Sequence, residues 1–359
     1  MALDVLRPRT EPDPDLGPDP HPGHDPSGAG RWARFVAVRA ARLVALLIGV
    51  AVLGFLLLEA SPLDPVDAYV GAEMARIGPE KRTLIAERWG LDDPAGVRFA
   101  RWAGNLARGD LGTSTIFNAP VSEVIAQRFR ASLALLALAW VLSGVVGFAL
   151  GITAAVRRDT WLDRAIRWLA YTFASAPTFW VGLLLLTVFA VQLGWAPVCC
   201  AAPIGADPDA VTLGQRLAHL ALPAITLSLV GIAPIALHTR EQAIGVLASE
   251  PVAFARAQGE RSLGLITTRV LRHAAVPAAM LQFASFSELL GGSVLAEQVF
   301  SYPGLGRATV EAGVRGDLPL LLGIALFAAV FVYVGNLLGD LVQSWLDPRV
   351  HLLDQQMGS

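Results

Sequence analysis

The chain has 359 residues, of which 54% are hydrophobic and only 16% are charged. An ordinary soluble domain carries about 25% charged residues, so this composition excludes a soluble globular protein and indicates an integral membrane protein. The net charge of -2 does not identify partners, because the positions of arginines matter more than their sum in such proteins.

The apolar runs are about 20 residues long and nearly free of charge, which matches helices that cross a bilayer. They do not alternate as barrel strands do, so an all-α membrane protein is expected. Lysine occurs once, at Lys81. A phosphate-binding GxxxxGK[ST] loop is therefore excluded, and the chain is not expected to hydrolyse ATP by itself.

Residues 1–30 are rich in Pro, Asp and Gly, which predicts a disordered cytoplasmic tail. His21 and His24 stand among acidic residues there and could hold a metal weakly, although a solvated tail is the simpler interpretation.

Six spanning helices are predicted, at about 43–58, 132–156, 168–193, 219–237, 277–295 and 320–341. Arginines precede the first span and follow the second, and such positive segments stay in the cytoplasm. Both termini are therefore expected to be cytoplasmic. Pro177 is expected to interrupt the third span, whereas the fourth opens near Pro223 and is broken again by Pro234.

The expected membrane domain covers residues 31–350, followed by a short cytoplasmic tail at 351–359. It contains an extracytoplasmic insertion at 61–128, with helical patches near 79–89 and 96–106, and an arginine-rich cytoplasmic loop at 241–276. Cys199 and Cys200 are adjacent, so no disulfide framework can be read from them. Two ordinary thiols are the simplest interpretation, with a metal or redox role left open.

Several short motifs occur in a fixed order between about residues 36 and 350. They are Gly90-Leu91-Asp92, Gly109-Asp110-Leu111-Gly112, Trp161-Leu162-Asp163-Arg164, Phe179-Trp180, Leu193-Gly194-Trp195, Ala255-Arg256-Ala257-Gln258-Gly259, Tyr302-Pro303-Gly304-Leu305-Gly306 and Leu346-Asp347-Pro348-Arg349. Together they resemble the inner-membrane permeases of binding-protein-dependent ABC importers, in the dipeptide, oligopeptide and nickel branch. One departure is Gln258, where lysine is commoner in that branch.

The resemblance implies a type I ABC importer permease fold in the cytoplasmic (inner) membrane of a bacterium. It also implies a homologous second permease subunit, two ABC ATPase subunits and an extracytoplasmic solute-binding protein as partners, with no nucleic acid. ATP and Mg would bind the ATPases, so no cofactor is expected on this chain. ATP binding would close the ATPase dimer and swing the spans from inward-open to outward-open.

The loop that would contact the ATPase is the stretch 250–259. Phe254 and Ala257 are three residues apart and share one face of a helix, and Gly259 can end it in a left-handed conformation. The alternative is a basic connector with no docking role. The candidate coupling residues are Glu250, Ala253, Phe254, Ala255, Arg256, Ala257 and Gly259.

A charge inside a span is costly, at about 2.5 to 3.5 kcal/mol on insertion scales, and so calls for a reason. Glu288 is the main candidate for the translocation path, and His238, Ser287 and Ser293 are the others. The alternative for Glu288 is a hydrogen bond to a neighbouring helix. By their match to the family, an outer gate is expected at Glu297, Tyr302, Pro303, Gly304 and Asp317.

The predicted function is import of di- or oligopeptides, with nickel or a metal chelate as the alternative substrate. No metal site is identified with certainty. A membrane enzyme is disfavoured because the sequence contains no HExxH or comparable catalytic motif. A proton-coupled carrier that uses Glu288 remains a further alternative, although such a carrier would not need the large basic loop.

Overall fold

The computed structural model describes residues 28–60, 84, 93–207, 210–260 and 262–346. Residues 1–27 of the predicted tail at 1–30, the predicted tail at 351–359 and most of the predicted patch at 79–89 lie outside these ranges. Residues 28–30 of the predicted tail are helical, so the prediction of disorder is wrong for them. The chain divides into two compact units, residues 1–46 and 47–359, and all the described residues from 93 onward lie in the second unit.

The described residues form helices and one two-stranded hairpin, which agrees with the all-α prediction. The hairpin pairs Thr113 with Pro120 and Ser114 with Ala119. The elements are α1 (Gly28–Glu59), α4 (Ala95–Ala107), β1 (Thr113–Ser114), β2 (Ala119–Pro120), α5 (Val121–Val156), α6 (Trp161–Ser175), α7 (Thr178–Leu185), the π-helical η2 (Leu186–Gln192), α8 (Leu213–Leu247), α9 (Glu250–Ala257), α10 (Ser262–Leu265), the π-helical η3 (Ile266–Val270), α11 (Leu271–Ala284), α12 (Phe286–Val299), α13 (Leu305–Val314) and α14 (Leu318–Leu346).

Four helices are long and apolar enough to cross a membrane, and the number rises to six if each of two bent pairs is one span. The α6–α7 pair bends by 111° and the α11–α12 pair by 54°. The first bend lies at Pro177, as predicted. Ala176 is extended there because a residue before proline is disfavoured in the helical region.

The prediction that prolines break the fourth span is wrong. The helix α8 extends over 35 residues and keeps both Pro223 and Pro234 in its interior. It starts at a capping box in which Thr212 and Gln215 bond each other's backbone amides. Inside a membrane, neighbouring helices and hydroxyl groups can satisfy the backbone groups that a proline frees, so the helix continues.

Small residues allow α5 and α8 to pack closely along their length. Ser143, Gly147 and Gly151 recur every four residues on α5, and all three are buried. A Cβ atom added at Gly147 would lie 2.9 Å from the Cβ of Ile235, and one at Gly151 would lie 2.6 Å from the carbonyl oxygen of Ala236. This spacing is typical of tight helix contacts in membranes.

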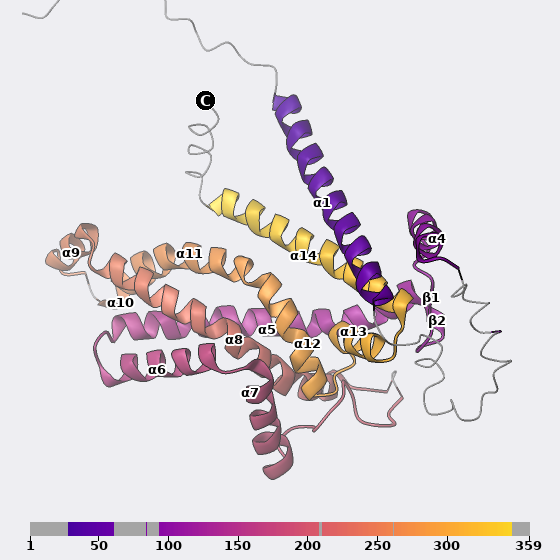
Figure 1. Cartoon of the computed structure of the whole chain (residues 1–359). Helices are drawn as coiled ribbons and strands as arrows, with labels where there is room; N and C mark the ends of the chain where they lie inside the picture. The colour runs from indigo at the N-terminus through magenta and orange to yellow at the C-terminus, as the bar shows by residue number, and fades with distance from the viewer. Residues whose placement is uncertain (1–27, 61–83, 85–92, 208–209, 261, 347–359) are drawn as a thin grey trace, which may run out of the picture. The chain divides into compact units, whose positions relative to one another are not determined.

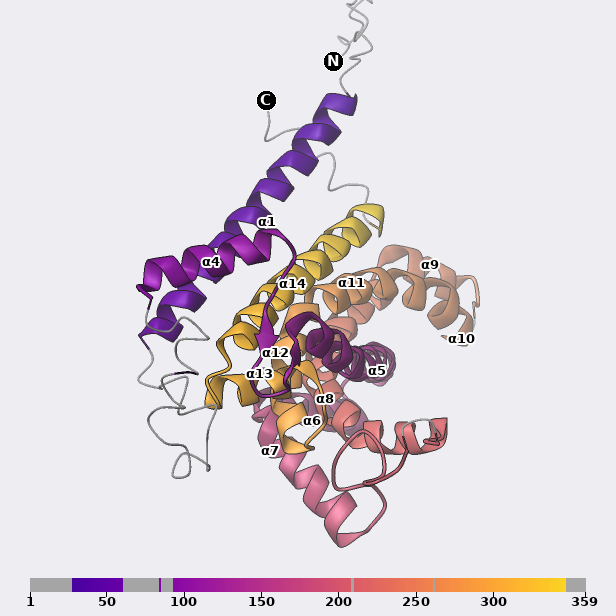
Figure 2. The same ribbon diagram turned by 90° about the vertical axis from the view of Figure 1, so that its right-hand side faces the viewer.

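The packed pair α5 and α8 forms the centre of the second unit, with α6 and α11 also packed on α8 (Figure 1). The short helices α9 and α10 lie at one end of this bundle, whereas α13 and the hairpin lie near the other. Figure 2 looks along the bundle from the end that carries α13 and the hairpin, so that α5 is seen nearly end-on. The predicted coupling residues and the predicted outer-gate residues are therefore far apart along the bundle.

Candidate functional site

The stretch predicted to contact the ATPase forms the two-turn helix α9. Pro251 stands in its first turn, where a missing N–H costs nothing, and Glu250 and Arg256 suit the helix dipole at the two ends. Gly259 follows with a φ of +84°, the left-handed conformation that glycine tolerates. The amide N–H groups of Gly259 and Glu260 donate to Arg256 and Ala255, which closes the helix end.

One face of α9 is held against the bundle and the other is open. Val252 and Ala255 are buried with Leu265, and Val246 of α8 packs against them. Ala255 therefore faces inward. The side chain of Phe254 is 66% exposed. The other exposed candidates are Glu250, Ala253, Arg256, Ala257 and Gly259.

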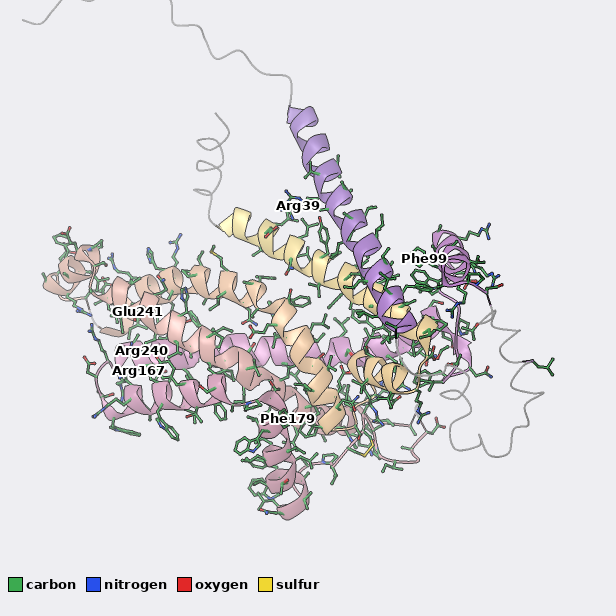
Figure 3. The ribbon with its side chains drawn as sticks, in the orientation of Figure 1. Arg39, Phe99, Arg167, Phe179, Arg240 and Glu241 are labelled. Atoms are coloured by element: carbon green, nitrogen blue, oxygen red, sulfur yellow. A yellow bond between two sulfur atoms is a disulfide. The ribbon has the colours of Figure 1, made fainter. Side chains whose placement is uncertain are left out.

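A buried ion pair joins α6 to α8 near this end of the bundle. The Asp163 side chain has no exposed surface and accepts two hydrogen bonds from Arg240, from Nε at 2.7 Å and from NH2 at 2.8 Å. Arg167 adds a longer ion pair at 3.4 Å. Figure 3 shows Arg167 and Arg240 close together. Asp163 belongs to one of the motifs on which the resemblance rests, but nothing in the sequence predicts its pairing with Arg240, 77 residues away.

The outer-gate candidates near α12 form one buried network around Glu297. Its carboxylate, with no exposed surface, accepts from the Ser132 hydroxyl at 2.6 Å and from the Arg307 amide at 2.9 Å. The Ser132 oxygen accepts in turn from the Leu305 amide at 2.7 Å. Gly304 lies directly against the carboxylate, since an added Cβ would overlap it. The network ties the turn after α12 to α5.

Tyr302 and Pro303 belong to the same turn. The amide N–H of Tyr302 donates to the backbone oxygen of Glu297 at 2.9 Å. Burial, with a smaller contribution from the charge of Glu297, raises the pKa of Tyr302 to about 12, so its hydroxyl stays protonated at physiological pH.

Asp317 joins the β1–β2 hairpin to the start of α14 through a second set of buried hydrogen bonds. Its fully buried carboxylate accepts from the Ser114 hydroxyl at 2.6 Å, from the Ile116 amide at 3.0 Å and from the Leu320 amide at 3.1 Å. It therefore caps α14 and fastens the β1–β2 hairpin to it. Asp317 and Glu297 bind separate partners, so the residues predicted to form one outer gate belong to two separate hydrogen-bonded clusters.

The translocation-path candidates do not converge on one point. Glu288 is exposed on α12, and the neighbouring Ser287 hydroxyl donates to Asn336 of α14 at 2.8 Å. Ser293 is buried and bonds the carbonyl of Leu290 in its own helix, so it does not face an open path.

His238 is exposed on α8 but lies at another depth from Glu288. Leu289, next to Glu288, packs at the level of Gly231 of α8. His238 is seven residues further along that helix, or roughly 10 Å at 1.5 Å per residue. Within the described ranges, no group of three or more His, Cys, Asp or Glu side chains is placed to hold a metal ion.

The interpretation of Cys199 and Cys200 as two ordinary thiols is wrong, because the structure joins them in a disulfide. Cys200 takes a positive φ of 76°, and its amide N–H donates to the Phe300 carbonyl at 3.0 Å. His219 Nδ1 lies 2.8 Å from the Cys199 carbonyl oxygen and so carries the proton of that bond. The disulfide segment therefore contacts the start of α8 and the turn at residues 300–304 that follows α12, which is called the outer turn after the gate predicted there.

Comparisons with known proteins place these features in context. The sequence profile of a family described as "Binding-protein-dependent transport system inner membrane component" matches residues 147–352. The oligopeptide transport system permease protein AppB of Bacillus subtilis is 30% identical over 319 residues, covering 89% of this chain and 99% of that protein.

Two further relatives have similar coverage. A putative peptide transport system permease protein of Brucella suis is 36% identical over 313 residues, covering 87% of this chain and 97% of that protein. The glutathione transport system permease protein GsiC of Salmonella paratyphi A is 34% identical over 317 residues, covering 88% and 98%.

A solved structure shows the same fold. The inward-facing MetNI methionine ABC transporter aligns with a TM-score of 0.51 and 17% identity, covering 63% of this chain and 97% of the matched chain.

Proposed function

The chain belongs to the family of inner membrane components of binding-protein-dependent transport systems, and on that premise we propose that it is the permease subunit of an ATP-driven importer of di- or oligopeptides. The resemblance, the type I permease fold and the multi-pass location in a bacterial cytoplasmic membrane, all expected from the sequence, are confirmed. The proposal of a peptide substrate rests on one observation: relatives named as peptide permeases match nearly the whole chain.

The partners follow from the same proposal. A separate ATPase dimer would hold ATP and Mg, since the sequence of this chain has no phosphate-binding lysine loop. A homologous permease would complete the path, and a solute-binding protein would deliver the peptide. The open face of α9, with Phe254 at its centre, is the surface offered to the ATPase. The buried face transmits the displacement to α8 through Val252 and Val246.

Replacing Ala257 by tryptophan is expected to abolish uptake while leaving membrane insertion intact. Ala257 is exposed on α9, so the added volume collides with the ATPase and leaves the chain's own core unchanged. A substitution at Gly259 acts differently: no atom lies within 4 Å of an added Cβ, but its positive φ would be strained. The measurement is uptake together with co-purification of the ATPase. Normal uptake by Ala257→Trp would mean that α9 is not the docking helix.

Glu288 is the residue we propose for contact with the peptide ammonium group. Its carboxylate is exposed on a span, where an unpaired charge is costly without a partner. The Glu288→Gln variant is expected to lower uptake of a dipeptide with a free amino group about tenfold, since a charge-assisted hydrogen bond contributes roughly 1.5 to 3 kcal/mol. An N-acetylated dipeptide that the wild-type importer accepts is the matched control, because its uptake should change little. An equal loss for both peptides, or loss of the protein from the membrane, would indicate a structural role.

Uptake of labelled substrates tests the proposed function directly. Cells with and without this chain would receive a panel of labelled dipeptides or labelled nickel, each with and without ATP depletion. We expect uptake of peptide only, dependent on both the chain and ATP. Nickel uptake that chelators suppress would support the alternative substrate, with Glu288 and His238 as its candidate contacts. Uptake that survives ATP depletion but is abolished by a protonophore would support the proton-coupled carrier instead.

A further inference from the structure

The buried carboxylate of Asp163 connects more of the structure than a single ion pair requires. Besides Arg240 and Arg167, it accepts a hydrogen bond at 3.0 Å from the amide of Asp159, in the loop between α5 and α6. The Arg240 side chain is itself only 13% exposed. A guanidinium bound through two nitrogens to one carboxylate is fixed in orientation as well as in distance. Asp163 thus fastens α6 and its preceding loop to one point of α8.

That point lies close to the coupling helix. From Arg240, α8 continues for seven residues to Leu247, or about 10 Å, and then passes through Ser249 into α9. Val246, between these positions, packs on the buried face of α9. A displacement of α9 would therefore be transmitted to α8 in two ways, through the covalent connection at residues 248–249 and through the packing of Val246 on α9. It reaches α6 through the Arg240–Asp163 pair.

We propose that Asp163 and Arg240 are positioning residues for energy coupling: they make α6 follow α8 when the ATPase displaces α9. The proposal rests on the proposed function. With the pair in place, movement of α9 is delivered both to α8 and to the bent span of α6 and α7. Without it, α8 moves while α6 lags behind, so ATP is hydrolysed with little transport.

An acidic neighbour of Arg240 reduces the cost of removing the Asp163 carboxylate. Glu241 is exposed, and its carboxylate lies 3.9 Å from Arg240 NH1. In the Asp163→Asn variant, Arg240 keeps Glu241 as an acidic neighbour but loses its charged attachment to α6. Arg167 loses its ion pair with Asp163 as well, but its side chain is 35% exposed and reaches water. The variant therefore removes the attachment more than it exposes an uncompensated charge.

The experiment measures peptide transported per ATP hydrolysed in proteoliposomes that hold the complete importer. We expect Asp163→Asn to retain ATP hydrolysis and to lower this ratio about tenfold, within the roughly 5- to 150-fold range of ordinary coupling between sites. Asp93→Asn is the matched control, because it breaks an exposed aspartate–arginine pair, at 2.6 Å between Arg101 of α4 and Asp93 just before that helix. Its ratio should equal that of the wild type.

A chemical link separates positioning from simple stability. The double variant Asp163→Cys, Arg240→Cys should be uncoupled until a short bismaleimide joins the two thiols, and a monofunctional maleimide should not restore it. An unchanged ratio in Asp163→Asn, or a loss of transport that the link fails to restore, overturns the proposal. If Asp163→Asn does not assemble, Arg240→Lys makes the same comparison, because lysine keeps the charge without the two-nitrogen contact. Wild-type proteoliposomes that transport no peptide would instead overturn the proposed function.

Discussion

Replacing Gly304 by alanine is expected to disrupt the outer turn and to abolish transport. The backbone at Gly304, with φ of -93°, is open to any residue, so space and not conformation requires glycine. An added methyl group would occupy the position of the Glu297 carboxylate. That carboxylate cannot turn away without leaving Ser132 and the Arg307 amide unpaired. Leaving a buried hydrogen-bonding group without its partner costs about 1 to 3 kcal/mol, and more for a charged group.

Thermal unfolding of the solubilised protein and uptake in cells are the two measurements for Gly304→Ala. Gly313→Ala is the matched control in α13, because no atom lies within 4 Å of its added Cβ. Ser132→Ala probes the same network from α5 without adding volume, and a smaller loss of stability is expected from it. Wild-type stability and uptake in Gly304→Ala would show that the carboxylate is not held as described.

The Gly151→Ala variant is expected to be strongly destabilised, by about 3 kcal/mol. The added Cβ would lie 2.6 Å from both the Ala236 carbonyl oxygen and the Thr239 Cβ. Because a backbone atom of a packed helix cannot rotate away, α5 and α8 must separate, and overpacking of this kind costs about 1 to 3 kcal/mol or more. Membrane abundance and the thermal midpoint of the purified protein are the measurements.

Gly245→Ala provides the matched control for this second variant. Gly245 lies in α8, one of the same two helices, and nothing lies within 4 Å of its added Cβ. Alanine in a helix interior is favoured over glycine by roughly 0.5 to 1 kcal/mol, so this variant should be as stable as the wild type or more so. Equal effects at Gly151 and Gly245 would contradict the close packing of α5 on α8.

Hydropathy was sufficient to predict most helices, because a span must be apolar over about 20 residues whatever its neighbours are. The bend at Pro177 was predicted for the same local reason. Helix ends were not: α5 begins at Val121, eleven residues before the predicted span, and α8 continues past both prolines. These extensions depend on contacts with other helices, which the period and composition of one segment do not contain.

Among the candidate sites, too, features encoded by neighbouring residues could be predicted, whereas contacts between distant residues could not. The helix α9 is encoded locally by its proline, its exposed phenylalanine and its terminal glycine, so its existence could be predicted. The pairing of Asp163 with Arg240 and of Glu297 with Ser132 could not, since 77 and 165 residues separate the partners. Only the packing of α6 on α8 and of α12 on α5 brings these groups together.

The disulfide between Cys199 and Cys200 makes the chain unreactive toward thiol reagents as it stands, because these are its only two cysteines. Cysteines engineered elsewhere can therefore be labelled with maleimides while both native residues stay in place. The condition is that no reducing agent is present during purification. A dithiol would open the pair, add two competing reaction sites and free the segment that contacts the outer turn through Cys200.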